Sequence, residues 1–251
     1  MAELKLPTET VKLPSKGLLY PKESPLSKGE IEMKYMTAKE EDILTNANFI
    51  KNGTVIDKLL QSLIVTPINY DELLVGDKNA ILIAARILGY GAEYSFKTYN
   101  SRGQEVDATV DLSKLNEKPL DESLFKPGVN EFSFTTPKTG DVLTFKLLSH
   151  GDEKKIEAEI KGLQKVNPNG SYDVTVRLKH IITSVNGIHE QKEVRGYVDN
   201  MLAPDARALR EYYSKVQPDV EMKYTPDDDN YVGEGIDIPI SLNFFWPDFG
   251  K

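Results

Sequence analysis

Cysteine is absent from the 251 residues of the chain. Its absence excludes disulfides, thiol nucleophiles and thiolate-bound zinc together, and it is compatible with a reducing compartment. Long apolar runs are absent too, because no stretch approaches the roughly 18 apolar residues that indicate a transmembrane helix. The first residues have no apolar core followed by a small-residue cleavage site. We therefore predict no secretory signal and no membrane partner.

Basic residues do not outnumber acidic ones either. The chain has 31 Lys and Arg against 39 Asp and Glu, which gives a net charge of −8. A protein that binds nucleic acid through its phosphates usually presents a basic face, whereas here basic residues stand beside acids, as in residues 39–46 and 151–161. We predict no nucleic-acid partner, although a basic patch formed only in three dimensions remains open.

Recognisable catalytic motifs are lacking as well. His150, His180 and His189 do not have the spacing of a zinc site. The three consecutive aspartates at 227–229 lack the alternation of a calcium loop, and the glycines at 89 and 91 follow a predicted helix instead of opening one. We predict no catalytic residue, no metal, no cofactor and no small-molecule ligand. A metal-dependent or hydrolytic enzyme is kept as the alternative.

The clearest periodicity lies in a helical segment at 36–93. Thr37 followed by Glu40 is the pattern of an N-cap with a capping box, and this helix is predicted to end near 46–48. A second helix with a broad apolar stripe is predicted between Thr54 and Pro67. A third is predicted over 78–88, with Asp77 as its N-cap. Its apolar face is so wide that the helices at 172–216 are predicted to pack on it.

The flanking regions have other patterns. Residues 1–35 contain four prolines and predict an extended arm with a strand at 31–35, which packs on the chain's own helices, lies on a neighbouring subunit, or does both. Alternating apolar residues predict two hairpins within 94–149. The segment 218–251 is predicted to be a strand tail, with Ile236, Ile238 and Ile240 in the strand, that ends in aromatic residues.

A second helical segment is predicted at 150–217, with Asp152 as the cap of its first helix. Over 172–185 the β-forming residues favour a strand, whereas the apolar spacing favours a helix, and we follow the spacing. The predicted fold class is α+β, with a helical core drawn from both halves of the chain and small antiparallel β-hairpins.

Several motifs taken together resemble a known family. In chain order they are LPSKGLLYP (13–21), KYMTAKEEDILTN (34–46), VIDKLL (55–60) and DELLVGDKNAILIAARILGYG (71–91), then more loosely RLKHIITSVNG (177–187), VRGYVDNMLAPDARALREYY (194–213) and FFWP (244–247). They resemble the baseplate hub proteins of T-even-type contractile-tailed bacteriophages, a group of hub subunits and hub assembly proteins.

The resemblance implies a non-enzymatic late protein that helps build the central hub of the tail. Its partners would be other baseplate hub and tail proteins, and it would be found in the virion tail baseplate, in the cytoplasm of the infected host, or in both. Two versions stay open: a structural subunit retained in the particle, and an assembly factor that leaves.

The resemblance also carries an expectation about zinc. Relatives of this kind carry Cys-x-x-Cys knuckles at places that correspond to 98–103 and 224–235, and this chain has no cysteine at either. The implied structure is a degenerate, metal-free zinc-ribbon-like β element, in which the C-terminal strand returns to the middle hairpin.

Two sets of apolar residues are candidate protein-interface residues, because large exposed aromatic and aliphatic side chains often anchor interfaces. The arm supplies Leu13, Leu18, Leu19 and Tyr20, and the C-terminus supplies Phe244, Phe245, Trp246 and Phe249. Burial in the protein's own core is the alternative for the aromatic residues.

Overall fold

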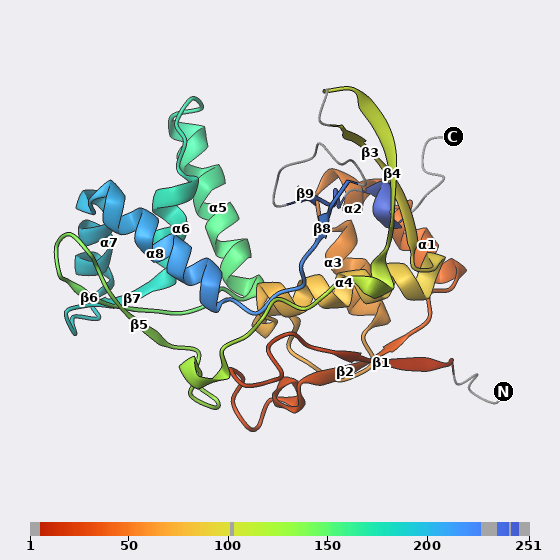
Figure 1. Ribbon diagram of the computed structural model, residues 1–251, viewed down its shortest axis with the longest axis horizontal. Helices are drawn as coiled ribbons and strands as arrows, with labels where there is room; N and C mark the ends of the chain where they lie inside the picture. The colour runs from red at the N-terminus through yellow and green to blue at the C-terminus, as the bar shows by residue number, and fades with distance from the viewer. Residues whose placement is uncertain (1–5, 101–102, 227–234, 241, 246–251) are drawn as a thin grey trace.

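Helix α4 (Val75–Tyr90) crosses the middle of the molecule, and two lobes meet at its N-terminal end (Figure 1). The first lobe is formed by residues 6–100, 103–112, 223–226, 235–240 and 242–245, and the second by residues 131–216. The structure is a computed structural model, described here for residues 6–100, 103–226, 235–240 and 242–245. Its mixture of helices and small antiparallel sheets confirms the α+β class.

Three helices precede α4 in the first lobe. They are α1 (Ala38–Leu44), α2 (Ala47–Lys51) and α3 (Val55–Leu63), followed by the 3-10 turn η2 (Tyr70–Glu72). The predicted start of α1 is confirmed, since the Glu40 carboxylate accepts hydrogen bonds from the backbone N–H and hydroxyl of Thr37 at 3.0 and 2.6 Å. The helix predicted to continue to 46–48 is instead divided in two, because the side chain of Asn46 caps α2.

The start of α4 differs from the prediction. The helix begins at Val75, so Asp77 lies in its first turn and is not the N-cap. Gly76 in this first turn lies directly against the carbonyl oxygen of Pro218, where an added Cβ would come within 1.8 Å. The Asp77 side chain is fully buried and turns toward the N-terminal arm.

The arm is a hairpin that packs on the chain's own helices. Strand β1 (Thr8–Lys12) pairs antiparallel with β2 (Glu30–Lys34), and the loop between them contains the 3-10 turn η1 (Pro25–Lys28). The predicted strand is confirmed, with Ile31 and Met33 buried. Strand β1 packs against α4, and Met33 forms a bridge with Ile64. The first of the two interpretations of the arm is therefore correct for the single chain.

The second lobe combines a three-stranded sheet with four helices. Its strands, in the order β5–β6–β7, are β5 (Phe132–Thr135), β6 (Val142–Phe145) and β7 (Ile182–Val185). Its helices are α5 (His150–Val166), α6 (Asp173–Ile181), α7 (Gln191–Asn200) and α8 (Ala203–Val216). The N-cap of α5 is Ser149, whose hydroxyl accepts from the N–H of Asp152 at 3.2 Å, so Asp152 is the partner of the cap and not the cap.

The prediction of a single helix over 172–185 is correct for its first part and wrong for its last four residues. Residues 173–181 form α6, but residues 182–185 form β7, which pairs with β6 through Thr144 opposite Ser184. The strand forms because β6 offers an open edge, and because Ile182 and Ser184 alternate toward the interior.

The chain returns to the middle hairpin at its C-terminus. The hairpin consists of β3 (Glu93–Tyr99) and β4 (Glu105–Asp111), and two 3-10 turns follow it, η3 (Leu112–Lys114) and η4 (Glu122–Leu124). The tail forms a two-residue pair, β8 (Lys223–Tyr224) with β9 (Ile236–Asp237), and then α9 (Leu242–Phe245). The strand predicted through Ile240 is therefore shorter than expected.

The predicted return of the tail to the hairpin is confirmed by ring contacts. Tyr94 meets Phe244 edge-to-face at 4.9 Å, and Phe96 meets Tyr224 at 5.6 Å. The hydroxyl of Tyr94 also donates to the carbonyl of Pro239 at 2.9 Å. The two hairpins stay separate sheets.

The wide face of α4 is covered from within the first lobe. Its closest neighbours are α3, α9, β1 and η3. The prediction that the helices at 172–216 pack along this face is wrong, since α6 packs on α5 and α7, and α7 packs on β7. The second lobe meets α4 at its first turn, and the buried side chains of both lobes belong to one continuous cluster.

Candidate functional site at the junction of the lobes

A buried hydrogen-bond network ties the arm to the first turn of α4. The Asp77 carboxylate accepts from the Ser15 backbone N–H at 2.9 Å, from the Ser15 hydroxyl at 2.6 Å and from the Tyr20 hydroxyl at 2.6 Å. The Tyr20 oxygen in turn accepts from the N–H of Leu74 at 2.9 Å. Burial raises the pKa of Asp77, while the hydrogen bonds from Ser15 and Tyr20 oppose that rise. The network closes a turn in which Gly17 has a φ of +75°.

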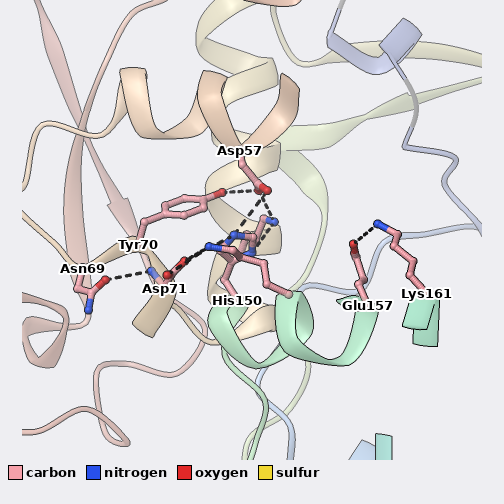
Figure 2. Close-up of polar contacts among 9 residues, drawn as sticks. Asp57, Asn69, Tyr70, Asp71, His150, Glu157 and Lys161 are labelled. Atoms are coloured by element: carbon pink, nitrogen blue, oxygen red, sulfur yellow. Dashed lines mark hydrogen bonds and ion pairs between the residues drawn. The ribbon is translucent and has the colours of Figure 1, made fainter. Parts of the chain in front are cut away.

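A second polar cluster joins the lobes beside this network (Figure 2). Asp57 on α3 accepts from the Lys78 ammonium at 2.6 Å and from the Tyr70 hydroxyl at 3.0 Å. His150, the first residue of α5, places Nε2 3.5 Å from Asp57 and Nδ1 3.1 Å from Lys78 Nζ. Its ring packs edge-on against Tyr70 with centroids 4.7 Å apart. Four elements of the two lobes therefore meet at one imidazole.

The surroundings of His150 favour its neutral form. Burial lowers its pKa, and the positive charge of Lys78 lowers it further, while Asp57 and Asp71 oppose the change. Since the Lys78 ammonium can only donate, Nδ1 is the acceptor and the proton of the neutral ring is on Nε2, toward Asp57. This arrangement can position side chains and hold the lobes together.

A cavity of about 670 Å³ lies next to the cluster, between the arm and the N-terminal end of α5. Tyr20 and Leu74 line it on one side, and Gly151, Lys154 and Lys155 on the other. Most of its lining charges are paired: Lys154 contacts Asp71 at 3.1 Å and Lys146 contacts Asp152 at 2.7 Å. The cavity thus offers mainly apolar surface at the junction.

Most of the predicted interface residues lie inside the protein. Leu13, Leu19 and Tyr20 are buried beneath the arm, and Phe244 and Phe245 are buried between α4 and the β3–β4 hairpin. Leu18 is partly buried. Trp246 and Phe249 lie outside the described residues. That these residues bind a partner stays a prediction. For the five buried side chains one part is corrected: they face the chain's own core, because the arm hairpin and the helices cover them.

The residues of the junction were not predicted as a site. Asp77 was interpreted as a cap, and Asp57, Lys78 and Tyr70 carry no motif that distinguishes them from other helix residues. His150 has no other histidine at the spacing of a metal site, so the sequence does not distinguish it. The usable signal was the pair of glycines, Gly17 and Gly76, since each marks a place where backbone approaches backbone.

Within the described ranges there is no group of three or more His, Cys, Asp or Glu side chains placed to hold a metal ion. Among the described residues, no helix has the length and apolar character needed to cross a membrane. Comparison with protein-family models, curated proteins and solved structures found no match for the chain.

Proposed function

We propose that this chain is a non-enzymatic baseplate hub protein of a contractile bacteriophage tail, which acts in hub assembly through contacts with other hub and tail proteins. The proposal starts from the resemblance in residues 13–91 and is supported by what those motifs do physically. Ser15 and Tyr20 of LPSKGLLYP bind Asp77 of DELLVGDKNAILIAARILGYG. The motifs therefore meet in space and fix how the arm packs on α4.

That contact between motifs is the observation that carries the proposal. Lys34, in the next motif, likewise donates to the buried Glu40 carboxylate at 2.8 Å, and Ser62 donates to the same oxygen. Partly covered Leu18 and the exposed edge of β1 are where a partner would reach the arm without unfolding it.

The packing of the tail on the β3–β4 hairpin supports a further part of the proposal. The described part of the tail packs on this hairpin through Phe244 with Tyr94 and Tyr224 with Phe96, as a zinc-ribbon-like element requires, while the chain has no cysteine to bind zinc. We propose that aromatic contacts hold the two hairpins together here in place of metal. Zinc content per chain, measured by atomic emission on purified protein, is expected to be negligible, and one bound zinc per chain would contradict this part.

The function is tested by affinity purification of the tagged full chain from infected cells late in infection. Known baseplate and tail proteins are expected to co-purify. The variant Leu18→Ser is expected to retain fewer of them while still unfolding in a single cooperative transition. Quantitative mass spectrometry of purified virions then separates the two versions, since a structural subunit remains in the particle and an assembly factor does not. Recovery of no tail protein would contradict the proposal.

A further inference from the structure

A second cavity, of about 470 Å³, opens in the second lobe between α5, β7 and α7. We call it the basic pocket. Its lining contains four Lys or Arg side chains and two histidines: Lys146, Lys155, Lys179, Arg195, His180 and His189. Asp152 is the single acidic residue among the described residues of the lining. This is a concentrated positive region on a chain whose net charge is −8.

The nearby carboxylates neutralise only part of this charge. Asp152 pairs with Lys146 at 2.7 Å and lies 3.9 Å from Lys155, and Asp199 pairs with Lys179 at 2.6 Å. Glu159 accepts from both His180 and Arg195; burial opposes the shift, but these hydrogen bonds lower its pKa. Three carboxylates thus face four Lys and Arg side chains, which leaves one positive charge in excess when the histidines are neutral.

Other donors in the basic pocket have no protein partner. Thr183 on β7 has a buried hydroxyl oxygen without a hydrogen bond in the described structure. The side chains of His189 and Gln191 are exposed and make no hydrogen bond or ion pair in the part of the chain described. A buried hydroxyl without a partner costs stability and calls for an explanation. Ile182 and Val194 complete the lining with apolar surface.

We propose that the basic pocket binds carboxylate groups of an acidic segment on a partner protein. The unpartnered hydroxyl of Thr183 and the side chains of His189 and Gln191 donate to a carboxylate. Lys155 adds positive charge, because it shares the single Asp152 carboxylate with Lys146. The apolar lining accepts the methylenes of a Glu side chain or an adjacent aliphatic residue. Cavities of about 300–1,000 Å³ are the usual size of ligand pockets, so the pocket holds a short segment and not a whole element.

One feature favours a protein segment over nucleic acid. No Phe, Tyr or Trp side chain is present among the described residues that line the basic pocket, so bases lack the large rings on which single strands usually stack. The preference for a protein segment over a free dicarboxylate rests on the proposed function.

The test uses the purified full chain and a fluorescein-labelled, end-capped peptide of sequence Glu-Glu-Leu-Glu-Glu, with binding followed by fluorescence anisotropy. Thr183→Val is expected to weaken binding about tenfold, the loss of one charge-assisted hydrogen bond. Its unfolding free energy should be unchanged or higher, because the lost hydroxyl has no partner in the protein.

A matched pair of lysines on α5 provides the control. Lys155 lies in the basic pocket and is 71% exposed, whereas Lys161 lies outside it and is 69% exposed. Lys155→Gln is expected to weaken peptide binding several-fold, and Lys161→Gln to leave it unchanged. Equal binding by wild type and Thr183→Val, or equal effects of the two lysine variants, would overturn the proposal.

The source of the carboxylate is tested by competition. Succinate that displaces the peptide at equal concentration, or a single-stranded oligonucleotide that binds more tightly than the peptide, would overturn the assignment to a protein segment. These measurements use no other phage protein. The chain can therefore bind the peptide even if the hub function is wrong, and it can fail to bind the peptide even if the hub function is right.

Discussion

At the scale of single residues, Asp77 does more than the sequence predicts. It binds Ser15 and Tyr20, which are 62 and 57 positions away in the chain. A helix cap can be predicted because both partners lie within one turn, as Thr37 and Glu40 do. A contact across sixty residues leaves no local pattern, so Asp77 before a helical stripe was interpreted as a cap.

The prediction for Asp77 concerns its three donors. In Asp77→Asn the amide group would face hydroxyl donors, leaving at least one buried donor without an acceptor. We expect the free energy of unfolding in urea to fall by about 1–3 kcal/mol. Asp42→Asn, at an exposed position on α1, is the control and should change it by less than about 0.5 kcal/mol. A loss no larger than the control's would mean that the network does not hold the arm.

His150 gives a prediction about pH. Because its folded-state pKa is lowered, the unfolded chain takes up a proton first as the pH falls below about 6.5. The stability from keeping this ring neutral is present above that pH and is lost toward the folded pKa, by at most about 1.4 kcal/mol per pH unit. In urea unfolding at pH 7.5 and 5.5, wild type should lose more stability than His150→Gln. Equal losses of stability by the two proteins would mean that His150 is protonated as readily in the folded chain as in the unfolded chain.

At the scale of elements, the boundary between α6 and β7 shows what periodicity cannot resolve. The apolar residues of 174–185 keep helical spacing throughout, yet the chain becomes a strand at Ile182. The deciding partner is β6, forty residues earlier in the chain. By contrast, the β3–β4 hairpin was predictable, because its two strands and turn are contiguous.

The joining of the tail to this hairpin leads to a prediction about Phe244. Its ring is buried against Tyr94 and Phe245. Phe244→Ala should lower the free energy of unfolding by about 3–5 kcal/mol, the usual cost of deleting a buried Phe. Tyr99→Ala, on the same hairpin but 63% exposed, is the matched control and should cost much less. If the two variants unfold alike in urea, the tail does not stabilise the hairpin.

At the scale of the whole molecule, close backbone contacts at the start of α4 join the two lobes: the Val75 N–H donates to the Leu148 carbonyl at 3.1 Å, and the His150 N–H donates to the Leu73 carbonyl at 2.7 Å. Gly76 of α4 lies against the Pro218 carbonyl, at the point where the chain leaves the second lobe for the first. The sequence predicted both helical segments but placed the contact along the face of α4. The difference arises because the tail, with Phe244 and Phe245, covers that face first.

Gly76→Ala tests this contact. The added methyl group would displace the Pro218 backbone, so we expect faster proteolytic cleavage near 217–222 and a lower midpoint of thermal unfolding. Gly162→Ala is the matched control, since Gly162 also lies in a helix but has no atom within 4 Å of an added Cβ. There the alanine should be neutral or stabilising by up to about 1 kcal/mol. Equal behaviour of the two variants would mean that the lobes are not held at Gly76.

The central claim, that the chain builds the hub of a contractile tail, is tested most directly by electron microscopy of lysates from cells infected by phage whose copy of this gene is disabled. The account predicts filled heads with few or no completed baseplates, and complete tails restored when the intact chain is supplied from a plasmid. Complete contractile tails in wild-type numbers without the chain would contradict it.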